Sequence, residues 1–347
     1  MGGGIVWCPH CGHPHRLGTR ICPTSAKVID REIHVAPSRD RNHPLIGTVV
    51  GGRYRVQRLV GRGAMGTVFE AENMVLRRMV ALKIVESTAS PEAALRLQRE
   101  AHLVAAVQHP NVCDVYDAGS LEDGRPFIVL ERLFGETLEA FLRRKRVHPI
   151  APIVDIFLQV LSGLHAAHGA KILHRDLKPQ NVFLAERLGC APIVKLLDFG
   201  IAKDLSGTRT PRSMYPGMLI GTLHYMAPEQ LRAESLTPRA DLFAVGVMLY
   251  EALVGTHPFA AESIDDFQAN LLRCKPLRPS LMRPDLTYEL EAVVLRALAP
   301  EPDARWSTAM DFQRALSAAA PRLPESTPPD SKVDSSGPES TGLQPLR

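Results

Sequence analysis

The sequence predicts an α+β fold, with a small β-rich lobe followed by a larger helical lobe. Short runs that alternate apolar and polar side chains come first, at 54–60 and 79–85. A helix is expected from Pro91 to about residue 107, where apolar residues recur at helical spacing. Long helical periods dominate the rest, at 150–167, 240–254 and 286–299. Strands first and helices later favour two separate lobes.

Composition sets the broad class. The chain has 347 residues, of which 45% are apolar, and this excludes wholesale disorder. The net charge of +4 is too small to predict a nucleic-acid or membrane partner, and 5% aromatic residues argue against a base-stacking surface. The most apolar stretches, 151–164 and 242–255, contain Asp155 and Glu251 and are shorter than the ~20 residues of a membrane span. The N-terminus has no signal-peptide pattern, so a cytoplasmic location is expected, with cysteines as thiols or metal ligands.

Changes in composition divide the chain into four parts. Residues 1–30 hold three of the six cysteines, and 31–53 has the Pro and Gly content of a linker. Residues 54–318 are continuously globular in pattern. The tail, 319–347, is rich in Pro and Ser, and we expect it to be disordered.

A glycine-rich segment follows the first strand, Gly61-Arg62-Gly63-Ala64-Met65-Gly66. Dinucleotide-binding folds also carry G-x-G-x-x-G, but there the motif opens a helix. Here Thr67–Ala71 reads as a second strand, which predicts a β-hairpin. Glycines in such a hairpin allow backbone N–H groups to approach phosphate oxygens. A turn without a ligand is the alternative interpretation.

Charged residues in unusual positions come next. Lys83 lies in an otherwise apolar strand, where a lysine needs a partner, and Glu100 on the following helix is the natural one. A solvated edge lysine is the alternative. Further on, His174-Arg175-Asp176-Leu177-Lys178-Pro179-Gln180-Asn181 is followed by Asp198-Phe199-Gly200. Carboxylates, an amide and a lysine on nearby loops suit phosphoryl transfer with Mg²⁺.

These motifs, in this order, resemble those of the eukaryotic-like protein kinases, in particular the bacterial Ser/Thr kinases. Ala227-Pro228-Glu229, Asp241 and Arg305 extend the match, which covers about 54–318. The resemblance implies the bilobal protein kinase fold, with a β-rich N-lobe and a helical C-lobe. It also implies transfer of the γ-phosphate of ATP to protein hydroxyl groups.

The resemblance implies a role for each matching residue. Lys83, paired with Glu100, would hold the α- and β-phosphates; Asp176 would accept the hydroxyl proton, and Lys178 would neutralise charge on the transferred group. Asn181 and Asp198 would bind Mg²⁺. The residues implied in ATP binding are Gly61, Arg62, Gly63, Ala64, Met65, Gly66, Val68, Ala81, Lys83, Glu131, Leu133 and Phe183. Of these, Val68, Ala81 and Phe183 would enclose the adenine, and Leu130–Leu133 would be the hinge. Glu229 with Arg305 would be a structural ion pair, while His174, Phe199 and Asp241 would be architectural.

Specificity for Ser/Thr is implied by Lys178-Pro179 and by Gly221-Thr222 before the Ala-Pro-Glu motif. The segment between Asp198 and Glu229 would be the activation loop, and Arg175 could pair with a phosphate on it. Its candidate phosphorylation sites are Thr208, Thr210 and Ser213, with ordinary loop hydroxyls as the alternative. Phosphorylation in trans would call for a homodimer.

The N-terminal segment resembles a zinc ribbon that lacks one ligand. Cys8-Pro9-His10-Cys11-Gly12 is similar to the first knuckle, and Cys22 follows. Ser25 stands where a complete ribbon has its fourth cysteine, so His13 or His15 would complete the set. We take Cys8, Cys11, Cys22 and His13 as candidate Zn²⁺ ligands of a module that docks a partner. A degenerate ribbon with free thiols is the alternative. Cys113, Cys190 and Cys274 are expected to be buried thiols.

Two other function classes compete with an active protein kinase. One is a pseudokinase scaffold, which the presence of Lys83, Asp176, Asn181 and Asp198 opposes. The other is a kinase for a small molecule, which the full segment up to Ala-Pro-Glu opposes, since it resembles a platform for protein substrates.

Overall fold

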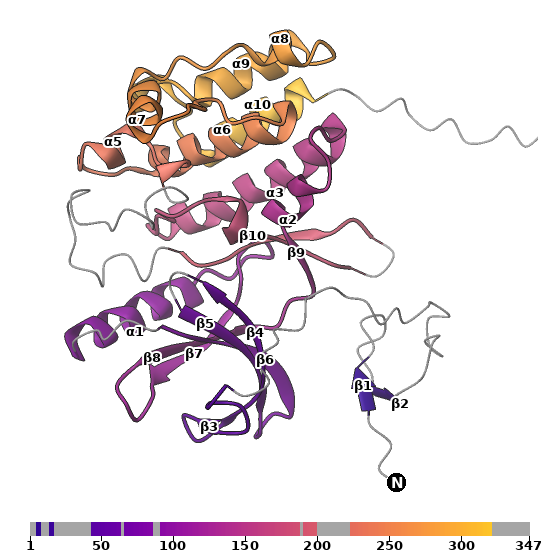
Figure 1. Cartoon of the computed structure of the whole chain (residues 1–347), viewed down its shortest axis with the longest axis vertical. Helices are drawn as coiled ribbons and strands as arrows, with labels where there is room; N and C mark the ends of the chain where they lie inside the picture. Colours follow the sequence, from indigo (N-terminus) through magenta and orange to yellow (C-terminus); the bar gives the residue numbers. More distant parts are fainter. Residues whose placement is uncertain are drawn as a thin grey trace, which may run out of the picture.

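The computed structural model describes residues 5–7, 14–16, 43–63, 66–85, 91–187, 190–199 and 223–320. Two lobes are stacked, with the sheet-based N-lobe drawn below the helical C-lobe (Figure 1). The sequence-based prediction of an α+β, two-lobed fold is confirmed. The strands expected at 54–60 and 79–85 and the helices expected at 91–107, 150–167, 240–254 and 286–299 are present, with ends that differ by a few residues.

The N-lobe is a six-stranded antiparallel sheet of order β3-β4-β5-β6-β8-β7. Its strands are β3 (Val49–Val50), β4 (Tyr54–Gly63), β5 (Gly66–Asn73), β6 (Arg78–Ile84), β7 (Val115–Ser120) and β8 (Pro126–Glu131). Helix α1 (Pro91–Ala105) packs on β7 and β8, with Leu97 and Ala101 buried against Ile128 (Figure 1). One face of the sheet carries a separate apolar core that includes Phe69, Leu82 and Val129.

Part of the segment assigned to the linker belongs to this lobe. Val50 on β3 is 3% exposed in the core, and the His43 ring lies 4.8 Å from Phe69, centroid to centroid. Gly51 and Gly52, which the sequence analysis assigned to the linker, have φ of +56° and +66° and lie in the turn from β3 to β4. They are the two central residues of the turn Val50–Arg53, which the hydrogen bond from the Arg53 N–H to the Val50 carbonyl oxygen closes at 3.2 Å, and glycine adopts the left-handed conformation without steric cost.

The C-lobe is built around two apolar helices. Its helices are α2 (Leu138–Arg143), α3 (Ile150–Gly169), α5 (Pro228–Leu231), α6 (Pro238–Val254), α7 (Ile264–Arg273), α8 (Pro279–Met282), α9 (Tyr288–Ala297) and α10 (Ala309–Ala319), with the 3₁₀ turns η1 (Pro179–Asn181) and η4 (Pro302–Ala304). A small sheet of order β11-β10-β9 faces the N-lobe; it consists of β9 (Gly135–Thr137), β10 (Val182–Ala185) and β11 (Ile193–Leu196). Helix α6 is buried on nearly all sides, because α3, α8 and α9 pack around it.

Helix α3 is long and apolar enough to cross a membrane by length and composition, and 56% of its apolar window is buried within the protein. It contacts α6, α10 and β11, and this packing accounts for its apolar composition. The helix is therefore only weak support for a membrane span.

At the N-terminus, β1 (Ile5–Trp7) pairs antiparallel with β2 (Pro14–Arg16). The candidate zinc ligands Cys8, Cys11, His13 and Cys22 lie outside the described residues, and so does most of the tail that begins at residue 319. The prediction of three buried thiols in the kinase-like region is wrong at one position. Cys113 and Cys274 are buried, but Cys190 is exposed in the loop between β10 and β11.

Candidate active site

The carboxylate of Asp176 is the centre of a polar cluster formed by residues 174–181. Lys178 donates from Nζ to Asp176 Oδ2 at 2.9 Å. Asn181 donates from Nδ2 to the Asp176 carbonyl oxygen at 2.7 Å and to Oδ2 at 3.3 Å. The turn η1, begun by Pro179, returns the chain so that Asn181 reaches Asp176. Asp176 is 5% exposed, and the hydrogen bonds hold its carboxylate in one orientation beside the Lys178 ammonium group. A proton acceptor for a hydroxyl group needs such a fixed orientation.

Asp241, at the start of α6, holds the beginning of the same loop. Its Oδ2 accepts the backbone N–H of His174 at 2.9 Å and the Nε2–H of His168 at 2.8 Å, and its Oδ1 accepts the backbone N–H of Arg175 at 2.9 Å. Burial alone would raise the pKa of Asp241, but these hydrogen bonds keep it below its ordinary value. Arg175 has a φ of +60°, which is uncommon for a residue other than glycine. Asp241 thus holds the loop in a strained conformation next to Asp176.

The two lobes meet through Lys83 and Asp198. Lys83 lies on β6 in the middle of the N-lobe sheet and is 7% exposed, so it is not a solvated edge lysine. Its Nζ is 2.7 Å from Asp198 Oδ1, in the segment after β11. Asp198 has a φ of +49°, a second non-glycine residue in the left-handed region. Glu100 lies partly buried on α1, and its pairing with Lys83 stays a prediction.

His174 and Phe199 pack beneath these groups. The two rings lie 4.7 Å apart, and His174 donates from Nε2 to the carbonyl oxygen of Leu197 at 2.9 Å. Burial lowers the pKa of His174, so the ring is neutral at pH 7. Phe199 is 4% exposed within the C-lobe core. Because Phe199 is packed into this core, it fixes the backbone next to Asp198 and with it the direction in which the Asp198 side chain points.

The glycine segment forms the predicted hairpin, since β4 and β5 pair antiparallel up to Gly63 and Gly66. Gly66 has a φ of +143°, and a Cβ there would lie 2.1 Å from the Ile84 carbonyl oxygen, so this glycine is required by the fold. Among the residues that the structure describes, a Cβ added at Gly61 would meet no atom within 4 Å, and one at Gly63 would meet only the Gly66 oxygen at 3.9 Å. The fold does not require glycine at these two positions, whereas a phosphate group close to the backbone would. Ala64 and Met65 lie outside the described residues.

Strand register places the expected adenine-contacting residues on one face of the sheet. Val68 is paired with Lys83, and Ala81 is paired with Leu130; directly opposed residues of antiparallel strands share a face. Val68 and Ala81 are partly exposed, whereas their neighbours Phe69 and Leu82 are fully buried on the other face. Phe183, on β10 of the C-lobe, is also partly exposed. Of the two expected hinge residues, Glu131 is the last residue of β8, and Leu133 follows it two positions later.

The residues present fit a Mg²⁺–nucleotide. A carboxylate from Asp198 and an amide from Asn181 are oxygen donors of the kind that Mg²⁺ prefers. The Asn181 amide nitrogen is committed to Asp176, which leaves its oxygen for a cation. Within the described ranges no group of three or more His, Cys, Asp or Glu side chains could hold a metal ion by itself. Such a site depends on phosphate oxygens for further ligands, which is how Mg²⁺ is usually held with nucleotides.

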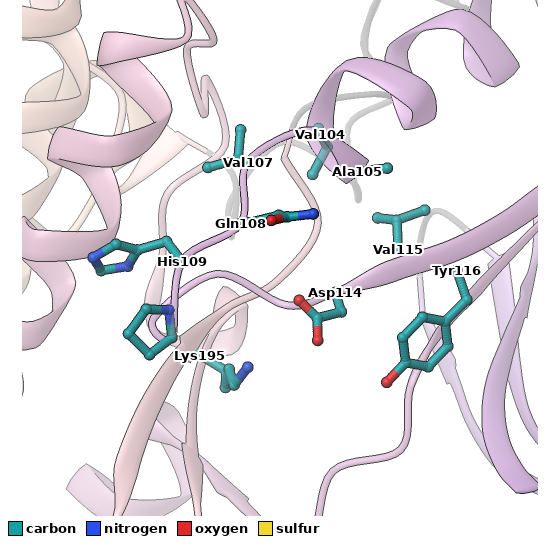
Figure 2. A pocket seen from close by; sticks show the side chains of 10 residues that line it. Val104, Ala105, Val107, Gln108, His109, Asp114, Val115, Tyr116 and Lys195 are labelled. Atoms are coloured by element: carbon teal, nitrogen blue, oxygen red, sulfur yellow. The ribbon is translucent and has the colours of Figure 1, made fainter.

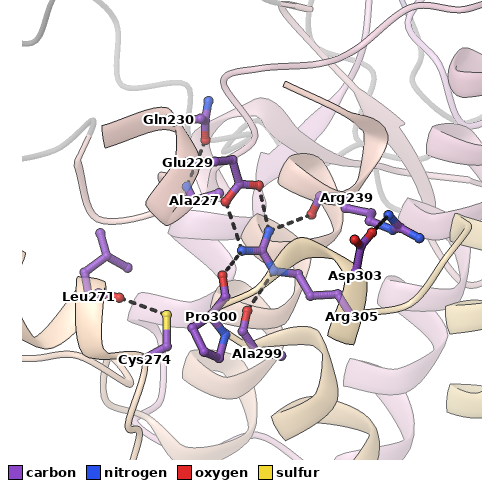
Figure 3. Close-up of polar contacts among 10 residues, drawn as sticks. All are labelled: Ala227, Glu229, Gln230, Arg239, Leu271, Cys274, Ala299, Pro300, Asp303 and Arg305. Atoms are coloured by element: carbon purple, nitrogen blue, oxygen red, sulfur yellow. Dashed lines mark hydrogen bonds and ion pairs between the residues drawn. The ribbon is translucent and has the colours of Figure 1, made fainter. Parts of the chain in front are cut away.

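The predicted ion pair of the C-lobe is present (Figure 3). Arg305 binds Glu229 through two hydrogen bonds, of 2.7 and 2.9 Å. The candidate phosphorylation sites Thr208, Thr210 and Ser213, with Gly200 and Thr222, lie outside the described residues. Sequence reasoning missed His168, which supports Asp241, and Lys195, which pairs with the hinge residue Glu131. Lys195 lies in an apolar run, Ile193–Leu197. A lysine in an apolar strand is the same sequence signal that indicates a partner for Lys83.

A family model described as protein kinase domain matches residues 54–316. Serine/threonine-protein kinase pkn3 of Myxococcus xanthus is 39% identical over 278 residues, which cover 79% of this chain and 51% of pkn3. Pkn1 of the same organism is 38% identical over 328 residues, covering 92% of this chain and 46% of Pkn1. The crystal structure of the Mycobacterium tuberculosis PknI kinase domain matches with a TM-score of 0.61 and 27% identity, over 79% of this chain and 98% of that domain. The chain spans about half the length of the curated relatives it matches.

Proposed function

The chain belongs to the protein kinase family, and we propose that it transfers the γ-phosphoryl group of ATP to serine and threonine hydroxyl groups of proteins. The observation that carries the proposal is the pairing of Lys83 with Asp198 above the Asp176 cluster. These contacts connect Lys83 of the N-lobe with Asp198, and Asp176 with Lys178 and Asn181 in the C-lobe, and these are the groups that phosphoryl transfer needs.

Each residue has a task in the reaction. Bound Mg²⁺–ATP supplies the phosphoryl group and a cation that neutralises its charge. Asp176 orients the substrate hydroxyl group and accepts its proton, and Lys178 beside it offsets negative charge in the transition state. Asn181 and Asp198 would hold Mg²⁺, and Lys83 the phosphates. Pre-positioning of these groups is the main catalytic contribution of the protein, since phosphoryl transfer needs little covalent chemistry from it.

We propose autophosphorylation as the means of activation, at Thr208, Thr210 or Ser213. Arg175 adjoins Asp176, so a phosphate bound by Arg175 would order the activation loop next to the catalytic base. Transfer between two copies in a transient homodimer would supply that phosphate.

The test is incubation of the full chain with Mg²⁺–ATP and a generic protein substrate, followed by mass-spectrometric mapping of phosphosites. Wild type is expected to place phosphate on serine and threonine, including one of the three loop sites, and Asp198→Asn is expected to place none. If wild type binds ATP and transfers nothing to itself or to any protein, the scaffold interpretation replaces the proposal.

The N-terminal segment is proposed to bind one Zn²⁺ through Cys8, Cys11, Cys22 and His13 and to dock a partner protein. Support comes from the hairpin of β1 and β2, because the segment that joins its strands contains Cys8, Cys11 and His13. A hairpin connection of this kind can bring two thiolates to one tetrahedral ion. The cytoplasmic location stays a prediction.

A further inference from the structure

A buried ion pair joins the hinge to the strand that leads to Asp198. Lys195 lies on β11, three residues before Asp198, and is 9% exposed. Its Nζ donates to Glu131 Oε1 at 2.6 Å, and the two side chains are 11% and 14% exposed. A buried charge is costly unless it is paired, so these two groups hold each other in place. The phosphoryl-transfer mechanism has no use for Lys195.

The pair is part of a network that involves a third element, the loop between α1 and β7. Glu131 Oε1 also accepts the backbone N–H of Asp114 at 2.9 Å, and the Glu131 N–H donates to the Asp114 carbonyl oxygen at 3.0 Å. Lys195 Nζ donates in addition to the carbonyl oxygen of Val112 at 3.3 Å. The same loop is joined to β11 through the Cys113 N–H and the Leu196 oxygen, 3.0 Å apart. Three segments from different parts of the chain are thereby fixed at one point.

This point lies behind the hinge. Lys195 and Asp114 line an open groove of about 510 Å³, whose other wall is the end of α1 with Val104 and Ala105 (Figure 2). Val68 and Ala81, whose strand register places them on one face of the N-lobe sheet, are not among the residues that line this groove. The network is therefore placed where it can set the hinge backbone without contacting a nucleotide.

The geometry points to Lys195 as a positioning residue for the adenine base. Glu131 begins the hinge, and Lys195 is on the strand that delivers Asp198, so their bond sets the spacing between the base-binding backbone and the phosphate-binding end of the cleft. A nucleotide must satisfy both ends at once, and a spacing fixed in advance lowers the entropic cost of binding. The inference rests on the proposed function, because it requires the hinge to bind the base of ATP.

The test compares two nucleotides in equilibrium titrations of the full chain. ATP carries a 6-amino group that can donate a hydrogen bond to a carbonyl oxygen of the hinge backbone. Purine riboside triphosphate lacks this group. Wild type should prefer ATP by about tenfold, the value of roughly one hydrogen bond. Lys195→Met should weaken ATP binding by about that factor and weaken the analogue far less, so that the preference disappears. Glu131→Gln, which keeps an acceptor for the Asp114 N–H and removes the charge, should do the same even if Lys195→Met does not fold.

A matched control lies in the C-lobe. Glu291 is 1% exposed and accepts from Arg278 at 2.8 Å and from the Ser280 N–H at 2.8 Å, so its partners are of the same kind as those of Glu131. Arg278→Met should lower the unfolding midpoint and leave the preference for ATP unchanged. If both hinge variants keep the wild-type preference, or lose affinity for the two nucleotides equally, the positioning role is overturned. If wild type binds neither nucleotide, the proposed function fails first, and this inference with it.

Discussion

Arg305 and Glu229, 76 residues apart in sequence, form a fully buried bidentate ion pair in the C-lobe (Figure 3). Arg305 is 0% exposed and makes five hydrogen bonds, two to the Glu229 carboxylate and three to the carbonyl oxygens of Ala299, Pro300 and Arg239. A guanidinium group has five N–H donors, so none of its donors lacks a partner. The pair anchors α5 to the turn η4 before α10.

Arg305→Met should destabilise the protein by about 3–5 kcal/mol, because it leaves the Glu229 carboxylate buried without a counter-charge. Chemical denaturation of wild type and variant measures the difference. Arg239→Met is the control, since Arg239 pairs with the 92% exposed Asp303, and an exposed pair contributes no more than about 1 kcal/mol. Equal losses for the two variants would contradict the assigned importance of the buried pair.

Two glycines of one hairpin should respond differently to alanine. Gly66→Ala combines a φ of +143° with a contact of 2.1 Å to the Ile84 oxygen, so it should cost at least about 1–3 kcal/mol of folding stability. The Cβ of Gly61→Ala meets no atom of the described part of the chain within 4 Å, so folding should be unaffected while ATP affinity falls. Thermal unfolding and nucleotide titration check the two effects. Unchanged ATP affinity in Gly61→Ala would argue against phosphates close to this backbone.

Stability should fall as the pH drops below neutrality. Burial lowers the pKa of His257 to about 4, and burial also lowers the pKa values of His109, His174 and His224. Unfolded histidines bind a proton from about pH 6.5 downward, so the unfolded state gains protons that the folded state does not. His257 alone should cost about 2 kcal/mol between pH 7.5 and pH 5.

Urea midpoints at the two pH values test this. His257→Gln should show a smaller pH dependence of the urea midpoint than wild type. The Tyr225–Glu251 pair near His257 acts in the opposite direction, because burial raises the pKa of Glu251. Identical pH dependence in His257→Gln and wild type would show that the imidazole is not protected from protonation in the folded state.

Zinc content tests the N-terminal module. The full chain purified without chelators should contain one zinc ion per molecule, and Cys8→Ser should lose it, because removing one thiolate opens a tetrahedral site. Cys190→Ser, which removes the exposed thiol between β10 and β11, should keep the metal. Elemental analysis gives the ratio directly. Absence of zinc from wild type would favour the degenerate ribbon with free thiols.

Local patterns were sufficient for the elements and for the residues that carry short motifs. Alternation predicted β4 and β6, and the motif order placed Asp176, Asn181 and Asp198 on neighbouring loops. Contacts between distant buried groups do not follow from local patterns, and the Glu229–Arg305 pair was expected only through the family resemblance. The Lys195–Glu131 pair spans 64 residues and the His174–Asp241 contact spans 67, and no periodicity links such partners. Gly51 and Gly52 were ambiguous for another reason, since a hairpin turn and a linker use the same residues.

The most direct test of the account is the rate of phosphoryl transfer by Asp176→Asn beside wild type, with ATP affinity measured on the same samples. The amide keeps the size of the side chain and cannot accept the hydroxyl proton, so the rate should fall by about 10²–10⁴ while ATP affinity stays within a factor of about three. Transfer at the wild-type rate by Asp176→Asn would contradict the assigned catalytic role. Absence of transfer by wild type with ATP bound would contradict the assignment of an active kinase.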